Sequence, residues 1–444
     1  MKKNNLLLVI LMSTISLSYG QTSFSIAEAI EYSVNNNANI KNALLGMEIA
    51  NQKVKETTAI GLPQVTATGQ FQNFLDIPIT VAPAIAFNPN ANPGDLVELQ
   101  FGTEYNATGA LSVNQLLFSG SYIVGLQTSK TYKAVSEYQK DKSIIDTKEM
   151  VMKAYYGLLV AGKTVKSLQE ISATSERIYK ETQAFYKEGL IEEDNVTQLS
   201  LNVLNSKNAL KNAERQLEYA KSVLKLQMGY DMNQDITLTS EFESVVSSLK
   251  PEVSAIESDV NQNIDFMLLN KQLELSKLNV KYEQSQYLPT LTAFFNHQQQ
   301  ALRNDFNLLD GSQPWYPTTI WGLNLSVPIF TGGSNRAQVA QAQISVMQNE
   351  NSIAQFNDGI TLQTQSAKFN YDNAYDNYLT SKESVAISKK IYSNYQIKFK
   401  EGLISSLDLS QIQTQYLSAE TQYIQAMYGL INAKIELDKI TNKL

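Results

Sequence analysis

Cysteine is absent from the 444 residues of the chain, and histidine occurs once, as His297. Without cysteine there is no disulfide, no thiolate metal site, no cysteine nucleophile and no lipid on an N-terminal cysteine. A single histidine excludes a histidine-based metal cluster or catalytic pair within one chain. We therefore expect no catalytic residue, no metal site and no cofactor, and we expect that the protein is not an enzyme.

Basic residues are too few to balance the acidic ones. The chain has 36 lysine and arginine residues against 43 aspartate and glutamate residues, for a formal net charge of −7. Proteins that bind nucleic acid need basic patches that contact phosphates. The charge balance therefore argues against nucleic acid as a partner.

Long hydrophobic runs are also missing. Residues 1–20 begin with two lysines, continue with a short apolar run at 6–11 and end in small residues at 18–20, so they are expected to be a signal peptide. The mature chain would then start near Gln21. No later stretch is long and apolar enough for a transmembrane helix. A mature chain that enters a membrane must therefore do so as a β-barrel, the other structure that satisfies its backbone there.

Proline is absent from two long segments, between Pro93 and Pro251 and after Pro328. Proline inside a helix costs about 3 kcal/mol, so these gaps permit very long helices. Each helix would span up to about 100 Å at 1.5 Å per residue. Their apolar residues recur every seven positions, which is typical of coiled-coil contacts. The recurring residues are Ile144, Val151, Leu158 and Val165, then Val203, Leu210, Leu217 and Leu224, then Tyr416, Tyr423, Leu430 and Leu437.

A pentapeptide, Lys-Glu-Gly-Leu-Ile, occurs at 187–191 and again at 400–404. Its glycine suits a sharp turn between helices, because glycine adopts positive φ without a Cβ clash. Each pentapeptide follows a long helical pattern and precedes a shorter one. The sequence therefore predicts two helical hairpins of one design, within an internal two-fold repeat. Two further pairs of motifs repeat with them: Leu62-Pro63 with Leu288-Pro289, and Phe118-Ser119-Gly120 with Phe330-Thr331-Gly332.

Between these motifs the apolar residues alternate with polar ones, most clearly at 105–114 and 321–327. This alternation is typical of strands in a membrane barrel. The alternative is an ordinary sandwich with one buried face, but the very long flanking helices favour the membrane. Four strands cannot close a barrel, so several chains would have to pool their strands. Aromatic residues that would form interfacial girdles are Phe71, Phe74, Tyr105, Phe118, Trp321 and Phe330.

These patterns divide the chain into a signal peptide at 1–20, a first repeat at 21–230, an equatorial linker at 231–257 and a second repeat at 258–444. In the linker we expect a small folded belt with a short strand at 236–239. Ser25 and Glu28 predict a capping box for a short first helix.

The first repeat is expected to hold strands near 64–75 and 104–118, a long helix at 121–188 and a helix at 191–229. The second is expected to hold strands near 290–301 and 319–330, a long helix at 333–401 and a helix at 405–441. The segment between the strands is longer in the first repeat, and we expect a loop there.

This arrangement resembles the outer membrane efflux protein family, the TolC-like channels, over essentially all of the mature chain. The resemblance implies a mixed α and β fold, mainly α, in a homotrimer. Four β-strands per protomer would contribute to a twelve-stranded transmembrane β-barrel in the outer membrane. Long antiparallel helical hairpins would form a trimeric α-barrel tunnel into the periplasm.

The resemblance also implies a function. Such a protein is the passive outer-membrane exit duct of a tripartite efflux or type I secretion system. It sits in outer-membrane lipid, and a periplasmic adaptor (membrane fusion protein) and an inner-membrane pump open its periplasmic end. The alternative that the sequence leaves open is a periplasmic coiled-coil scaffold without channel activity.

The family places the periplasmic gate and the adaptor-docking tips around the two glycine turns. An acidic residue six positions after the second glycine matches Asp408, and Gln411 stands where the family often has a second acid. The arginine that latches the closed mouth in some members is replaced by Ile404, so that latch cannot be carried over. The positions that the resemblance assigns to the tips are Tyr186, Gly189, Asp194, Asn195, Phe399, Gly402, Asp408 and Gln411.

Two other features have competing interpretations. Glu188, Glu192, Glu193 and Asp194 either start a helix and complement its dipole, or make the channel mouth negative. Residues 157–164 match the nucleotide-binding pattern GxxxxGK[ST]. A phosphate loop requires a preceding strand, but helical spacing precedes this segment, so we expect it to lie within a helix.

Overall fold

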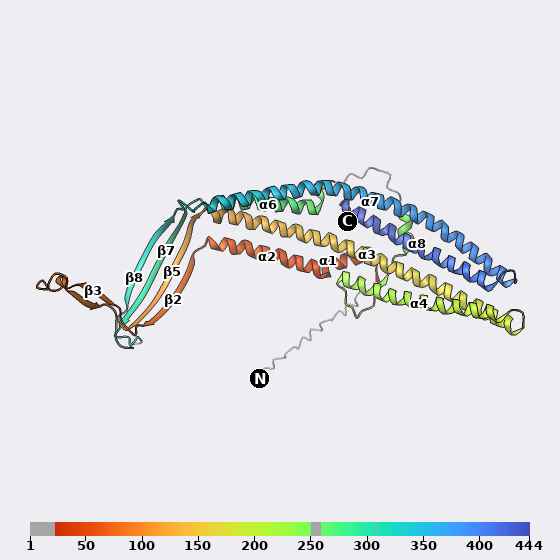
Figure 1. Cartoon of the computed structure of the whole chain (residues 1–444), viewed down its shortest axis with the longest axis horizontal. Coiled ribbons are helices and arrows are strands. Elements are labelled where there is room, and N and C mark those ends of the chain that lie inside the picture. The colour runs from red at the N-terminus through yellow and green to blue at the C-terminus, as the bar shows by residue number, and fades with distance from the viewer. Residues whose placement is uncertain (1–22, 250–258, 309) are drawn as a thin grey trace, which may run out of the picture. The chain divides into compact units, whose positions relative to one another are not determined.

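The computed structural model describes residues 23–249, 259–308 and 310–444 (Figure 1). The expected signal peptide and part of the expected linker lie outside these residues. The chain divides into two compact units. One comprises residues up to Leu45 with Gln139–Phe266 and Gln355–Leu444, and the other comprises Gly46–Tyr138 with Met267–Ala354. Across the described residues, no helix is long and apolar enough to cross a membrane.

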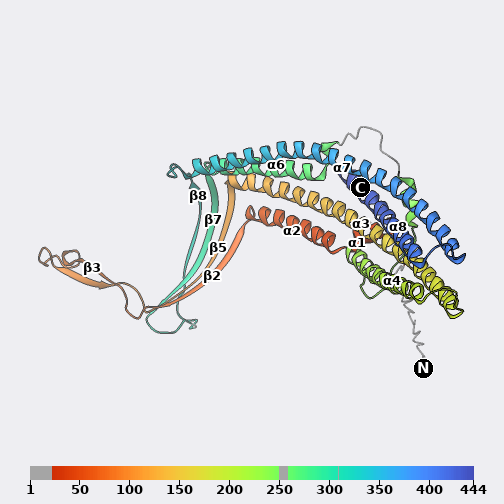
Figure 2. The ribbon, with the colours of Figure 1, turned by 45° about the vertical axis from the view of Figure 1, so that its right-hand side comes forward.

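The second unit contains a four-stranded antiparallel sheet in the order β2–β5–β7–β8. Figures 1 and 2 show these strands side by side. The strands are β2 (Gln64–Asn73), β5 (Tyr105–Ser119), β7 (Thr290–Arg303) and β8 (Tyr316–Ser326). Each strand pairs with the next over ten or more residues, and a bulge between Leu116 and Phe118 shifts the register at one end of β5. Strands from both halves of the chain thus form one sheet.

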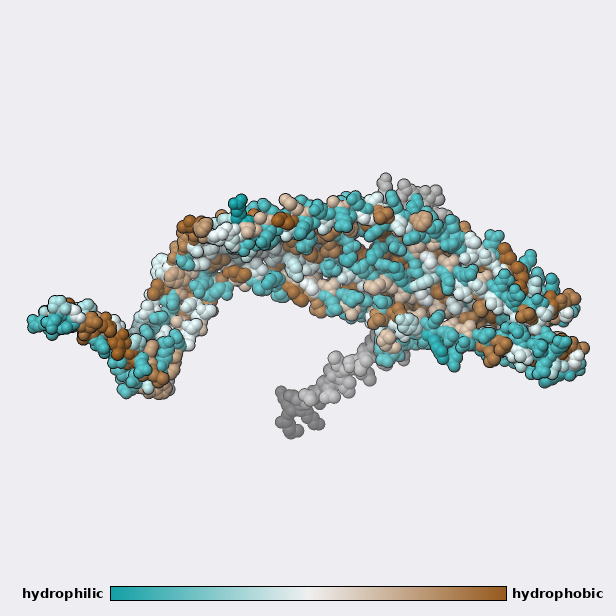
Figure 3. All heavy atoms as spheres, viewed as in Figure 1, coloured by the Kyte–Doolittle hydropathy of each residue, from teal (hydrophilic) through white to brown (hydrophobic). Residues whose placement is uncertain are grey.

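The segment between β2 and β5, which we expected to be a loop, contains a β-hairpin. Its strands are β3 (Ile79–Pro83) and β4 (Leu96–Gln100), joined through the short helix η1 (Ala84–Ala86). The hairpin pairs only with itself, and its apolar side chains such as Ile79, Val81 and Leu96 are more than half exposed. Figure 3 shows a brown, hydrophobic patch on it beside teal residues. Alternating apolar residues on both sides of a turn explain why this insertion pairs with itself.

The repeated Leu-Pro and Phe-Ser-Gly motifs meet where β5 passes into a helix. The helix α3 (Gly120–Lys187) starts directly after Ser119. A Cβ on Gly120 would lie 2.5 Å from Leu288 Cδ1, so only glycine fits there without displacing that side chain. Leu288 itself lies between α6 (Ile264–Ser285) and β7. The first and second halves of the chain are therefore packed together at this junction by one leucine and one glycine.

The first unit holds two antiparallel helical hairpins. The first joins the part of α3 from Gln139 onward to α4 (Glu193–Met228). The second joins the part of α7 (Ser334–Lys400) from Gln355 onward to α8 (Ser406–Ile440). Heptad residues predicted from the sequence lie in their core, among them Val151, Leu224 and Leu430, which are fully buried. Burying a side chain of this size contributes about 1.5–3 kcal/mol. The seven-residue period therefore marks the packing seam of the hairpins.

A small belt packs against these hairpins in the same unit. The strand β1 (Ser23–Phe24) pairs in parallel with β6 (Thr237–Leu238), followed by α5 (Phe242–Ser248) and the short helix η2 (Val260–Gln262). The hydroxyl of Tyr155 donates a hydrogen bond of 3.0 Å to the carbonyl oxygen of Phe24. The predicted capping box of Ser25 and Glu28 is confirmed at the start of α1 (Ile26–Asn36). The belt is thus tied to the middle of α3.

One loop glycine is fixed by close packing as well as by its backbone angle. Gly229 follows α4 with φ +68°, and a Cβ there would lie 2.5 Å from the carbonyl oxygen of Asn36. Next to it, Asn37 Nδ2 donates a hydrogen bond of 2.6 Å to the Gln227 carbonyl oxygen. Gly229 therefore joins the end of α4 to the connection between α1 and α2 (Ala38–Ile60).

We expect Gly229→Ala to destabilise the protein more than Gly189→Ala. Both glycines have positive φ, which costs alanine about 1–2 kcal/mol, but only Gly229 also meets backbone atoms. Thermal unfolding of the detergent-solubilised variants measures the difference, and Gly189→Ala is the matched control. Equal losses of thermal stability would contradict the packing role of Gly229.

Candidate functional site

The two helical hairpins turn through the same backbone motif. Gly189 has φ +74°, its N–H donates to the Tyr186 carbonyl oxygen at 2.9 Å, and the Leu190 N–H donates to the Phe185 carbonyl oxygen at 3.0 Å. This pair of bonds is a Schellman motif, which ends a helix on a left-handed glycine. Gly402, with φ +70°, makes the same pair in the second hairpin with Phe399, Leu403 and Lys398.

The helices that follow these turns begin differently. Glu192 is the N-cap of α4 and makes no side-chain capping hydrogen bond. Ser405 is the N-cap of α8 and forms a capping box with Asp408, whose Oδ2 accepts bonds from Ser405 Oγ at 2.7 Å and from Ser405 N at 3.1 Å. The repeat is therefore asymmetric at its tips, because the helix after the second turn starts with a capping box and the helix after the first turn does not.

Asp408 is exposed and negatively charged at neutral pH. Hydrogen bonds from the Ser405 side chain, and then from its backbone, hold the pKa of Asp408 below its ordinary value. Ionised carboxylates accept such bonds strongly, so the capping box and the charge support each other. The structure thus gives Asp408 a local structural role in addition to the charge that the family position implies.

Polar side chains join the two hairpins near their tips. Asn195 Oδ1 accepts a hydrogen bond of 2.7 Å from Ser406 Oγ. One helical turn further along α8, Ser410 Oγ accepts a bond of 2.6 Å from Asn202 Nδ2. Two more contacts, Gln413 with Ser175 and Lys400 with Glu181, connect α8 and α7 to α3. Near the tips, the contacts between the first hairpin and the second are therefore neutral hydrogen bonds and an exposed ion pair.

The sequence interpretation named Asn195 but missed its partners. Ser406, Ser410 and Gln413 are buried on one face of α8 at spacings of four and three residues. The sequence signal that marks them is a set of small or neutral polar residues spaced to share one face of the helix. When such a face is buried, its polar groups need hydrogen-bond partners. Of the other predicted tip residues, Tyr186, Asp194 and Gln411 are exposed.

An aromatic and aliphatic cluster lies close to the polar residues Ser406, Ser410 and Gln413 of α8. The rings of Tyr392 and Tyr416 stack with centroids 5.5 Å apart, and Leu409 beside them is fully buried. Burial and the nearby Glu420 raise the pKa of Tyr416 to about 12, so this phenol stays neutral. Phe399 and Ile404 pack partly buried against the same cluster. At the position of the family arginine, this chain therefore makes an apolar contact.

The four-stranded sheet has two chemically distinct faces. We call the even-numbered residues of 64–73, 105–116, 290–303 and 316–326 the polar face, and the odd-numbered residues the apolar face, because paired residues share parity. The polar face consists mainly of amide and hydroxyl side chains and contains no charged residue. On the apolar face, Trp321, Leu323 and Leu325 are more than 60% exposed. His297 lies on that face, with Nδ1 2.7 Å from Thr319 Oγ1.

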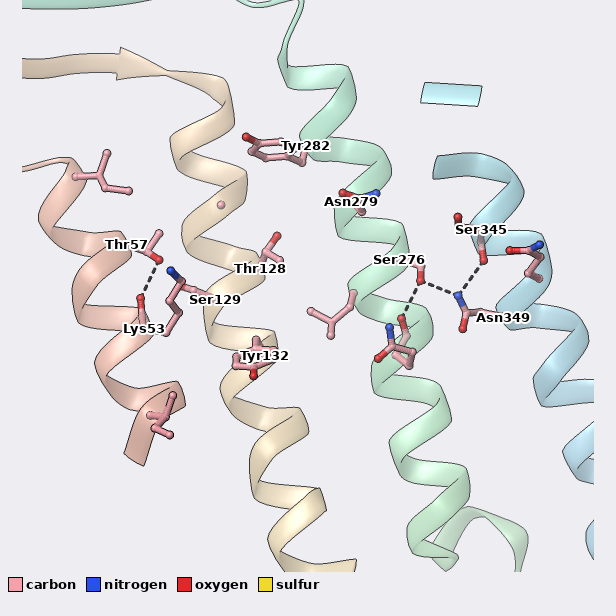
Figure 4. Close-up of a pocket in the computed structure, with 16 residues that line it drawn as sticks. Lys53, Thr57, Thr128, Ser129, Tyr132, Ser276, Asn279, Tyr282, Ser345 and Asn349 are labelled. Atoms are coloured by element: carbon pink, nitrogen blue, oxygen red, sulfur yellow. Dashed lines mark hydrogen bonds between the residues drawn. The ribbon is translucent and has the colours of Figure 1, made fainter. Parts of the chain in front are cut away.

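A groove of about 990 Å³ lies among helices of the same unit as the sheet. Side chains from α2, α3, α6 and α7 line it (Figure 4). Most lining residues carry hydroxyl or amide groups; Asn349 Nδ2, for example, donates 2.8 Å bonds to Ser276 Oγ and to the Ser345 carbonyl oxygen. Lys53 is the one charged lining residue, and it pairs with Glu56. The groove thus has hydroxyl and amide groups in its lining and is nearly neutral.

The segment that matches the nucleotide-binding pattern lies wholly inside α3, at 157–164. A phosphate loop must present free backbone N–H groups, which a continuous helix engages in its own bonds. This segment therefore has the helical structure expected from its spacing.

Comparison with known proteins agrees with this geometry. Residues 257–443 match the sequence profile of a family described as outer membrane efflux protein. A curated relative, the outer membrane protein TolC of Vibrio cholerae, is 20% identical over 334 residues, covering 74% of this chain and 75% of its own length. The predicted resemblance to the outer membrane efflux protein family is confirmed. The same matches confirm the expected outer-membrane localisation.

Solved structures of outer-membrane channels share the fold of the chain. The CmeC channel of Campylobacter jejuni aligns with a TM-score of 0.74 and 17% identity, over 96% of this chain and 90% of that one. The MtrE channel of Neisseria gonorrhoeae, in its open state, aligns with a TM-score of 0.70 and 15% identity, over 94% and 88% of the two chains. The fold class expected from the sequence, mainly helical with long hairpins and four sheet strands, is confirmed.

We expect Ser405→Ala to lower the unfolding free energy by about 1 kcal/mol at neutral pH, because it removes an N-cap. The change also removes the main cause of the depressed pKa of Asp408. A carboxyl with a depressed folded pKa stabilises the fold above its unfolded pKa, and this contribution disappears as pH falls through the folded pKa. The difference in unfolding free energy between wild type and variant should therefore become smaller below pH 3.8.

Thermal unfolding at a series of pH values measures this gap. Ser418→Ala, at an exposed serine further along α8, is the matched control and should show no such narrowing. A gap that stays constant down to the acid limit would contradict the capping role of Ser405.

Proposed function

We propose that the chain is the outer-membrane exit duct of a tripartite efflux or type I secretion system. One observation carries the proposal: a four-stranded sheet with an exposed apolar face and an uncharged polar face, whose strands β5 and β8 lead along the chain into the long helices α3 and α7. An apolar face of this kind suits lipid, and a polar face of this kind suits a water-filled passage. The family match supports the same role.

The duct would be a homotrimer. The strands β2 and β8 form the two edges of the sheet and leave unpaired backbone groups along ten or more residues each. Such edges cannot face lipid, because an unpaired backbone group there costs several kcal/mol. Pairing β8 of one protomer with β2 of the next satisfies both edges and closes twelve strands around one pore. The trimer and its closed barrel are therefore part of the proposal.

The helical hairpins would extend into the periplasm as the wall of a tunnel, with the glycine turns at its mouth. Opening would separate the hairpins near these turns. This movement must break the contacts of Asn195 with Ser406 and of Asn202 with Ser410. The tip positions assigned by the resemblance remain candidates for the gate and for adaptor docking, with Asn195 the best supported by a contact.

A periplasmic adaptor and an inner-membrane pump would open the duct. A partner shifts such an equilibrium only by binding the open state more tightly than the closed one. The exposed, acidic residues after the first turn, Glu192, Glu193 and Asp194, are available for such contacts. The duct itself would contribute a path and a gate, and no chemistry.

Asn195→Ala and Ser406→Ala are expected to raise the basal conductance of the purified protein in planar bilayers. Each removes a hydrogen bond worth about 0.5–1.5 kcal/mol, which corresponds to a roughly 2- to 10-fold rise in the ratio of open to closed channels. Asn205→Ala, at an exposed position of α4, is the control and should leave the conductance unchanged. Equal conductance in all three variants would argue against this contact as part of the gate.

Cross-linking the mouth should block the channel. Because the chain has no native cysteine, Gln411→Cys gives a single reactive thiol at an exposed position on α8. A cleavable thiol-specific linker that joins protomers there is expected to abolish conductance, and cleavage should restore it. Unchanged conductance in the fully linked trimer would contradict the gating model. A protein that dissolves without detergent and never conducts would instead support the scaffold alternative.

A further inference from the structure

The groove among α2, α3, α6 and α7 has no part in the gating contacts or in the sheet. Its volume of about 990 Å³ lies at the upper end of the range of about 300–1,000 Å³ that is typical of ligand sites in proteins. All of its lining residues belong to the compact unit that also contains the sheet. The groove is therefore large enough for a ligand of several rings.

Two tyrosines on neighbouring helices supply aromatic rings to this groove. Tyr132 of α3 is 47% exposed, and the side chain of Tyr282 extends from α6 toward α3 (Figure 4). Neither phenol hydroxyl has a hydrogen-bond partner among the described residues. An accessible tyrosine offers an apolar ring and a polar tip. The two side chains thus suit a ligand that has both apolar and polar surfaces.

Amide groups lie beside these rings. The side chains of Asn279 on α6 and Gln348 on α7 are exposed and make no hydrogen bond within the described part of the chain. Each amide can donate two hydrogen bonds and accept two. A ligand with hydroxyl or amide groups of its own would therefore find unused donors and acceptors in the groove.

The charged residues of α6 point away from the groove. Its groove residues recur at spacings of three and four from Gln272 to Tyr282, whereas Glu274 and Lys277 fall on the opposite side of the helix. There Lys277 Nζ lies 3.7 Å from Oε1 of Glu350. The one charged lining residue, Lys53, already forms an ion pair. The groove is therefore poorly suited to a charged ligand.

We infer that this groove binds a neutral oligosaccharide. A sugar ring has an apolar face of C–H groups, which packs on the ring of Tyr132 or Tyr282, and an edge of hydroxyl groups, which bonds to amides such as Asn279. A purely apolar ligand would leave those amides without partners, and a charged ligand would lose its hydration without gaining a free counter-charge.

This binding site goes beyond the proposed function and does not require the chain to conduct. The helices α2 and α6 lead into β2 and β7, and β5 and β8 lead into α3 and α7. In the proposed duct, the groove would therefore lie on the periplasmic side, next to the membrane.

Isothermal titration calorimetry on the purified full-length protein tests the inference. The probes are maltotetraose, which carries only hydroxyl groups, and the tetramer of N-acetylglucosamine, which also carries acetamido groups. The detergent must lack a sugar headgroup, because such a headgroup would compete for the site. Wild type is expected to bind at least one probe saturably. Binding of the N-acetylglucosamine tetramer alone would identify an acetamido-bearing glycan as the ligand, and binding of maltotetraose would identify a ligand recognised through its hydroxyl groups.

Two substitutions locate the binding in the groove. Tyr132→Leu removes an aromatic ring, and Asn279→Leu replaces an amide by an apolar group of similar size. Each is expected to weaken binding by roughly 2- to 10-fold, the range for loss of one hydrogen bond or a contact of similar strength. Tyr287→Leu and Gln284→Leu are the matched controls, because both side chains are exposed and neither lines the groove. Their affinities should equal that of wild type.

The outcomes separate this inference from the proposed function. Failure of wild type to bind either tetrasaccharide would overturn the inference, and so would equal losses of affinity in the groove variants and their controls. Should Tyr132→Leu fail to fold, Asn279→Leu and Gln284→Leu give the same comparison at exposed positions. Wild type that conducts in planar bilayers but binds neither probe refutes the inference alone. Wild type that binds a probe but never conducts refutes the proposed function alone.

Discussion

Backbone hydrogen bonding at the edges of the sheet is the constraint on which the rest of the structure depends. The four strands satisfy one another internally, but β2 and β8 each leave one side unpaired. Neither water nor lipid suits this sheet alone, since one face is apolar and both edges are polar. In the proposed membrane setting, both edges of the sheet need further strands to pair with. The trimer that we propose supplies them, and the helices connected to the strands are then arranged around the same axis.

The sequence was most informative where a strict period governs burial. The heptad positions, for example Leu224 and Leu430, are fully buried because a seven-residue spacing keeps one helix face toward its partner. Alternation likewise separated the two faces of the sheet, because paired residues share parity. Periodic segments of this kind are predictable because one rule applies to every residue in them.

Features that depend on contacts between distant segments were not predictable. The bond between Asn195 and Ser406 joins residues 211 positions apart, and nothing in the sequence pairs one with the other. The hairpin of β3 and β4 was expected to be a loop, because this segment is an insertion relative to the second repeat. The capping box at Ser405 follows a known pattern, but its pattern residue, Asp408, was interpreted only through its family position.

The replacement of the family arginine by Ile404 has a thermal consequence. A mouth closed by an exposed ion pair loosens as ionic strength rises, because salt screens the charges. At this position Ile404 instead packs against the cluster of Tyr392, Tyr416 and Leu409. Apolar contacts are weakly affected by salt but lose strength on cooling. In the proposed gate, this part of the closed state is therefore sensitive to cold rather than to the ionic composition of the periplasm.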